Sequence, residues 1–181
     1  MIESAIYNHL NHHINSSALD LFYSFYHRSG CKKIKIENFE KTKLGFSIPG
    51  IVYLNELVFD LPIHYFLYVI LHEISHQFQY KKYGKDFVLK YYLDPKLFDN
   101  FWRVEVAADR LAIIKTLQIL RKNNPESSLK LISVYNTEDK KESIKKYLED
   151  LNKEINNLGI NTIDEINKYL IQKSKQDVPQ L

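Results

Sequence analysis

Two histidines and a glutamate near the middle of the chain have the types and spacing of a metal site. They lie in residues 71–77 (LHEISHQ), inside a stretch whose apolar residues recur at helical intervals. On an α-helix His72 and His76 stand one turn apart on one face, where both imidazoles can reach one ion. Glu73 lies beside that face, where a carboxylate can take a proton from a metal-bound water. The alternative is a buried helix whose histidines only form hydrogen bonds, because H-E-x-x-H alone is not specific.

A second helical segment further along the chain, residues 102–112 (WRVEVAADRLA), supplies acidic side chains at the same spacing. Glu105 and Asp109 are four residues apart, so they share a helix face, and the small Ala108 and Ala112 on or near it allow two helices to approach closely. Catalytic zinc needs three protein ligands and an open position, so we predict that Glu105 joins the two histidines. Asp109 is then placed to accept the second ring N–H of a ligand histidine. Alone, the pair would indicate only an exposed acidic patch.

The order H-E-x-x-H followed by E-x-x-A-D resembles the gluzincins, the zinc peptidases in which a helical glutamate completes the metal site. Thermolysin-like enzymes share the spacing of four between Glu and Asp, and the segment VEVAADRLA in a short chain looks most like the ImmA/IrrE-type metallopeptidases. The resemblance covers roughly residues 44–115, with specific motifs only at the two metal segments. It implies Zn²⁺ as the cofactor and Glu73 as the catalytic base. A SprT-type site cannot be completed, because that family uses a later histidine and none follows His76.

The resemblance also indicates where a substrate would lie. Residues 50–55 (GIVYLN) resemble the edge strand that lines the gluzincin cleft, to which an extended peptide adds as a further strand. We expect substrate contacts from Tyr53 in this strand and from Tyr80, which continues the histidine line of the helix. The donor that stabilises the oxyanion stays open, with packing as the alternative role of each tyrosine: it is a lysine or one of Tyr80, Tyr83, Tyr91 and Tyr92.

Composition is that of an ordinary globular protein. The chain has 181 residues, of which 45% are hydrophobic and 26% charged, enough to bury a sizeable core. A net charge of +3 is too small to indicate a nucleic-acid partner. We find no secretory signal and no apolar run long enough to span a bilayer, so we expect no membrane association. The single Cys31 fits a reducing compartment, and we expect a cytoplasmic protein.

The elements expected around the metal segments predict an α+β fold. A small, mostly antiparallel sheet should pack on the helices that carry H-E-x-x-H, with the two metal helices adjacent. We divide the chain into a zincin-like metallopeptidase domain, residues 1–124, and a helical C-terminal extension packed on it, residues 125–181. The expected helices cover about 3–27, 62–83, 94–122, 125–135, 138–157 and 162–174, and the expected strands cover about 32–39, 44–48 and 50–54.

These patterns favour a zinc-dependent metallopeptidase that hydrolyses peptide bonds in a specific protein substrate. One alternative is a regulatory or defence-related protein-binding module with a zincin fold and little general proteolytic activity. Another is a non-enzymatic domain whose zinc is structural or missing, against which the retained Glu73 argues. His9, His12 and His13 form a second histidine cluster, for which a solvated helix face is favoured over a second metal site.

Overall fold

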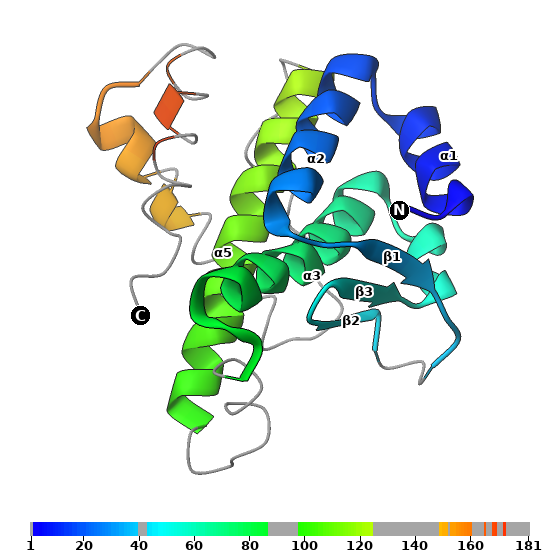
Figure 1. Cartoon of the computed structure of the whole chain (residues 1–181). Helices are drawn as coiled ribbons and strands as arrows, with labels where there is room; N and C mark the ends of the chain where they lie inside the picture. The colour runs from blue at the N-terminus through cyan, green and yellow to red at the C-terminus, as the bar shows by residue number, and fades with distance from the viewer. Residues whose placement is uncertain are drawn as a thin grey trace.

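The long helix α3, Ile63–Tyr83, lies between a small sheet and the other helices (Figure 1). The computed structural model describes residues 2–39, 43–86, 98–124, 149–151 and 153–160, with the single residues 165, 168, 169 and 172. The arrangement of helices around a three-stranded sheet confirms the predicted α+β class. The other elements are α1 (Ser4–His13), α2 (Ser16–Ser29), β1 (Lys33–Ile36), β2 (Gly45–Ile48), β3 (Ile51–Leu54), the 3₁₀ helix η1 (Glu56–Asp60) and α5 (Phe98–Asn123).

Helix α3 is buried along most of its length because it has neighbours on several sides. It contacts α5, α2, η1 and the strands β2 and β3, and from Tyr65 to Tyr80 every side chain except Phe78 is buried. The helix begins directly after Pro62, where a missing backbone N–H removes no helical hydrogen bond. It ends at Gly84, whose φ of 82° favours glycine. Both ends lie where the sequence predicted them.

The predicted single helix over residues 3–27 is wrong, because the chain breaks it into α1 and α2 at Ile14 and Asn15. The Asn15 side chain accepts a hydrogen bond from the Ala18 backbone N–H at 2.9 Å and so caps α2. Its amide also donates to the carbonyl oxygens of Lys122 and Asn123 at the end of α5, at 3.2 and 3.0 Å. One side chain therefore forms hydrogen bonds with backbone groups at the start of α2 and at the end of α5, and these bonds stabilise the break between α1 and α2.

The sheet has the strand order β1-β3-β2 and is mixed, which corrects two sequence-based predictions. Strand β2 pairs with β3 in an antiparallel hairpin, whereas β1 pairs with β3 in parallel, so the sheet is not mostly antiparallel. The reason is that β1 docks on β3 rather than on β2, the strand that follows it in sequence. Strand β3, predicted as the edge strand, is therefore central, and β2 is an edge of the described sheet.

The hairpin is fixed to α3 by one buried amide. The side chain of Gln77 accepts a hydrogen bond from the Gly50 backbone N–H at 2.7 Å, and its amide nitrogen donates to the Ile48 carbonyl oxygen at 2.8 Å and to the Ser47 hydroxyl. Gly50 has a φ of 86°, which the tight turn requires. Because Gln77 lies one residue after His76, this contact fixes the position of β2 relative to the histidines.

Helix α5 packs along α3 and joins the same core (Figure 1). Ala108 and Ala112, predicted to allow close approach, are 1% and 0% exposed. Leu151 and Ile155 from the C-terminal part are buried in the same hydrophobic cluster. The predicted start of the Glu105 helix at residues 94–97, the tyrosines 91 and 92, and most of the predicted helices after residue 124 lie outside the described residues.

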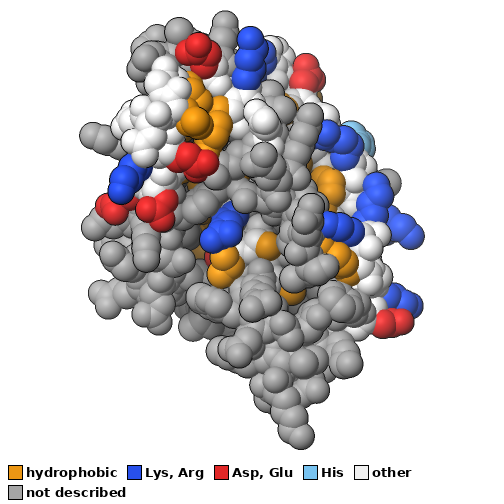
Figure 2. Space-filling model, turned by 90° about the vertical axis from the view of Figure 1, so that its left-hand side faces the viewer, with side chains coloured by type: hydrophobic (Ala, Val, Ile, Leu, Met, Phe, Trp, Pro, Cys, Tyr) orange, Lys and Arg blue, Asp and Glu red, His pale blue; other side chains and the backbone are white. Residues whose placement is uncertain are grey.

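One face of the molecule carries side chains of both charges. On the face shown in Figure 2, both acidic and basic side chains lie on the part of the chain that is described, in keeping with a net charge of +3. None of the helices in the described ranges has both the length and the apolar character needed to cross a bilayer.

Candidate metal centre

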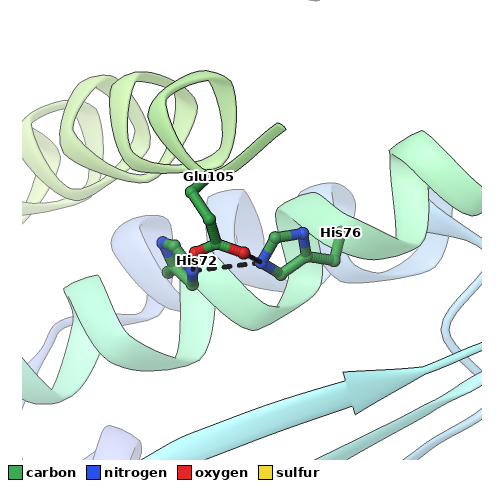
Figure 3. Close-up of side chains that lie close together, drawn as sticks. All are labelled: His72, His76 and Glu105. Carbon is green, nitrogen blue, oxygen red and sulfur yellow. Dashed lines mark hydrogen bonds and ion pairs between the residues drawn. The ribbon is translucent and has the colours of Figure 1, made fainter. Parts of the chain in front are cut away.

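The structure brings together the three side chains predicted as metal ligands. His72 and His76 project from consecutive turns of α3, and Glu105 reaches them from α5 (Figure 3). The two Nε2 atoms are 3.1 Å apart, and the Glu105 carboxylate oxygens lie 3.3 Å from His72 Nε2 and 3.4 Å from His76 Nε2. One potential ligand atom from each residue therefore lies within 4.8 Å of the others, which is compatible with a metal site.

These separations can be compared with the size of a tetrahedral site. Ligand atoms about 2.0–2.1 Å from an ion at tetrahedral angles are about 3.3–3.4 Å from one another. The observed 3.1, 3.3 and 3.4 Å are close to that spacing. The 3.3 and 3.4 Å distances are to different oxygens of the same carboxylate, Oε2 and Oε1, so Glu105 can offer either oxygen to an ion shared with the two histidines. The donor set therefore fits a four-coordinate ion.

The ring of His72 is held by a carboxylate on α5. Its Nδ1 lies 2.7 Å from Asp109 Oδ1, and the Tyr68 hydroxyl donates to the same oxygen. With Nδ1 paired to a carboxylate, Nε2 is the ring nitrogen that faces Glu105 and His76, and it is the nitrogen that an ion could bind. Asp109 therefore lies beside a ligand histidine, as its spacing of four from Glu105 predicted. Tyr68 is an additional partner of the Asp109 carboxylate.

The ring of His76 is held by a neutral amide. Its Nδ1 lies 2.8 Å from Gln79 Oε1, and Gln79 Nε2 donates to the Val104 carbonyl oxygen at 2.8 Å. Only the amide nitrogen can donate to a carbonyl, so this second bond identifies Oε1 as the atom that faces the ring. Gln79 Oε1 accepts from Nδ1–H, which leaves the His76 Nε2 lone pair directed at the centre of the cluster.

Charge is concentrated at this buried position. Burial disfavours the imidazolium of His72, but the carboxylates of Asp109 and Glu105 outweigh it and raise the pKa of His72 to about 10. Burial lowers the pKa of His76 to about 4, and the neighbouring His72 adds to this effect while Glu105 opposes it. In the metal-free protein one proton on His72 thus compensates the carboxylates. A metal cation would take over this role and displace the proton.

Glu73, the predicted base, is buried and directly follows His72 on α3, but it is not part of the group of metal-binding side chains. Its side chain is directed toward β2, because a methyl group added at Gly45 would lie 2.9 Å from Glu73 Cγ and 3.1 Å from Glu73 Oε1. The residue is 8% exposed. Only a glycine leaves room for this carboxylate between α3 and the strand, so Gly45 allows Glu73 to lie where it does.

The two predicted substrate contacts lie on different sides of the sheet. The Tyr80 hydroxyl donates to the Ser47 carbonyl oxygen at 3.0 Å, and burial with the charges of Glu73 and Glu105 raises the pKa of Tyr80 to about 12. Tyr53 alternates with the buried Val52 and Leu54, so its ring lies on the face away from α3, where it stacks on Phe46 with centroids 4.6 Å apart. The structure thus brings Tyr80 near the centre and does not bring the Tyr53 ring there.

Two contributors to the site and one residue that fixes the β2–β3 hairpin were missed at the level of sequence. Gln79 orients His76, Gln77 fixes the hairpin, and Gly45 makes room for Glu73. A signal existed for Gly45, since a glycine inside a predicted strand indicates a close approach. Gln79 also lies one turn from His76, but its second partner on α5 could not be inferred from local spacing.

The remaining sequence features lie away from the cluster. The rings of His9 and His13 are 4.6 Å apart, and His9 also packs on Phe66; His12 and His13 are exposed. Within the described ranges the histidines of α1 belong to no group of three metal-binding side chains. Cys31 is buried, and burial raises the pKa of its thiol to about 11.

Compared with known proteins, the chain matches no family model, no curated protein and no solved structure. The function must therefore be argued from the site itself.

Proposed function

We propose that this chain is a zinc-dependent metallopeptidase of gluzincin type that hydrolyses peptide bonds in a specific protein substrate. The observation that carries the proposal is the convergence of two histidines of an H-E-x-x-H helix with a glutamate from α5. Both histidines are also held at Nδ1, by Asp109 and Gln79. Ligands fixed in this way are typical of a preformed catalytic metal site.

Zinc is the ion that we propose for this donor set. Two imidazole nitrogens, one carboxylate oxygen and an open fourth position are typical of catalytic zinc, whereas Mg²⁺ and Ca²⁺ prefer sites made of oxygen ligands. When bound, zinc supplies a Lewis acid that polarises the scissile carbonyl and lowers the pKa of the attacking water toward about 7.

Glu73 is the proposed general base. Glu73 directly follows His72 on α3, and its carboxylate is not needed as a ligand, because His72, His76 and Glu105 provide three. In this role a Glu73 oxygen takes a proton from the attacking water and later passes it to the leaving amine nitrogen. The burial of Glu73 supports the role, because it keeps bulk water away from the carboxylate.

The outer edge of β2 is the proposed place for the substrate backbone. The Asn55 N–H donates to the Leu44 carbonyl oxygen at 2.9 Å, so alternation along the ladder directs the backbone groups of Gly45 and Ser47 away from β3. An extended peptide can add there by backbone hydrogen bonds. Tyr80 binds the Ser47 carbonyl at this edge and would lie beside such a peptide, which supports its predicted role. The Tyr53 ring is not part of the proposal.

The first test is metal content and cleavage by the purified protein. We expect about one zinc per chain in the wild type and little in His72→Ala. Incubation with a peptide library made from a digested proteome, followed by mass spectrometry of new N-termini, should show zinc-dependent cleavage that chelation removes. Cleavage of a few library members, without digestion of casein, would match narrow specificity; a wild type that binds no zinc, or binds zinc and cleaves nothing, would contradict the proposal.

The second test separates catalysis from metal binding. Glu73→Gln should keep the zinc and lose at least about a hundredfold in kcat, because general base catalysis contributes about that much or more. Glu37→Gln is the matched control, since Glu37 is exposed and follows β1. Full activity of Glu73→Gln would refute the assigned base.

A further inference from the structure

We propose that Gln79 is a positioning residue that fixes the tautomer of His76 and its distance from Glu105 with a single amide. This inference rests on the proposed metal site and extends it to a residue outside both metal motifs. Gln79 is 4% exposed, so each of its polar atoms needs a partner. Its contacts to His76 Nδ1 and to the Val104 carbonyl oxygen are both 2.8 Å.

The first contact determines which nitrogen of His76 can bind a metal. A neutral imidazole carries its proton on one nitrogen, and the hydrogen bond made by one nitrogen selects the other as ligand. Gln79 Oε1 can only accept, so it stabilises the form with the proton on Nδ1 and the lone pair on Nε2. Without this acceptor, His76 would lose the preference for the form that presents Nε2.

The second contact joins the two helices that carry the ligands. Val104 directly precedes Glu105 on α5, and its carbonyl oxygen accepts from Gln79 Nε2. The amide therefore spans from a ligand on α3 to the backbone beside the ligand on α5. A change in the spacing of the helices at this level must stretch one of the two hydrogen bonds. Gln79 thus couples the position of Glu105 to the orientation of His76.

The neutral charge of Gln79 also matters for the balance of the site. A bound zinc ion would bring two positive charges beside the carboxylates of Glu105 and Asp109, and both histidines would then be neutral. His72 is oriented by a carboxylate and His76 by an amide, so orientation of the second ring adds no further negative charge. A carboxylate at position 79 would keep the acceptor but lose the donor to the Val104 carbonyl.

Three variants separate these contributions. Gln79→Leu removes both hydrogen bonds and should weaken zinc binding by about 10–100-fold, measured by competition with a chelator. Gln79→Glu retains the acceptor and should bind zinc more tightly than Gln79→Leu. The control is Gln77→Leu, which removes an equally buried glutamine of the same helix whose partners are in the β2–β3 hairpin. It should destabilise the fold and leave the zinc affinity of the folded protein unchanged.

A spectroscopic measurement distinguishes positioning from general stability. In ¹⁵N-labelled metal-free protein, the His76 ring nitrogens should report a proton on Nδ1 in the wild type and in Gln77→Leu, and a mixture of tautomers in Gln79→Leu. Wild-type zinc affinity in folded Gln79→Leu, or an equal loss in Gln77→Leu, would overturn the inference while the metal site stood. A wild type that bound no zinc would overturn the site and this inference together. Zinc binding without any peptide cleavage would refute only the proposed reaction, and the expected losses in Gln79→Leu would then still support the positioning role.

Discussion

Replacement of Gly45 by alanine should separate catalysis from metal binding. The added methyl carbon would lie 2.9 Å from Glu73 Cγ and 3.2 Å from Leu54 Cδ2. Carbon atoms pack best at about 3.5–4.0 Å, so the Glu73 side chain must move by about 0.6 Å or the strand must shift. Overpacking of this kind costs about 1–3 kcal/mol. Since a misplacement of about 1 Å can cost about a hundredfold in rate, we expect kcat to fall at least about tenfold.

The assay compares zinc affinity, thermal stability and kcat on the best-cleaved library peptide. Gly45→Ala should keep wild-type zinc affinity, because the three atoms nearest to the new methyl carbon belong to Glu73 and Leu54 and not to a metal ligand. Gly159→Ala is the matched control, with a φ of 64° and open space around the added carbon; backbone strain of about 1–2 kcal/mol should lower its stability without changing kcat. Full activity of Gly45→Ala would refute the claim that this glycine positions the base, and a loss of zinc would show that the strand, rather than Glu73, had moved.

Four further predictions concern ionisable groups. Asp109→Asn should weaken zinc binding about 10–100-fold in chelator competition, because the His72 ring loses a charged acceptor; unchanged affinity would contradict this role. Zinc binding at pH 6 should release about one proton, measured by calorimetry in buffers of different ionisation enthalpy, because the pKa of His72 is raised to about 10 in the metal-free protein, whereas a zinc-bound water with a pKa near about 7 stays mostly protonated at that pH. For the same reason the stabilisation of the metal-free fold by His72 should be complete below about pH 6.5 and disappear as the pH rises toward about 10. Cys31, whose pKa burial raises to about 11, should react with iodoacetamide at pH 8 far more slowly in native than in urea-unfolded protein, and equal rates would refute its burial.

The parts of the site that could be predicted from the sequence are those set by a single helix. A separation of four residues places His72 with His76, and Glu105 with Asp109, whatever surrounds them. The ends of α3 at Pro62 and Gly84 follow from local backbone chemistry in the same way. That the two helices meet was inferred because a catalytic ion needs a third protein ligand. The structure brings Glu105 together with His72 and His76, as this inference predicted.

What could not be predicted depends on contacts between distant segments. Nothing local to β1 indicates whether it pairs with β2 or β3, and the mixed sheet follows from that choice. The helical pattern of residues 3–27 continues through Asn15, so the break becomes visible only when its side chain meets the end of α5. The position of Tyr53 depends likewise on which face of the sheet α3 covers.

The correction of the sheet changes how the site would work. With β3 as the edge, the groups available to a peptide would have flanked Tyr53, whose ring lies on the face away from α3. With β2 as the edge, the strand that offers its backbone also carries Gly45, against which Glu73 packs, and Ser47, which Tyr80 binds. Gln77, the residue after His76, holds that strand against α3. The same part of α3 therefore positions the metal ligands, the proposed base and the edge of β2 proposed for the substrate. A small shift of this helix would move all three together.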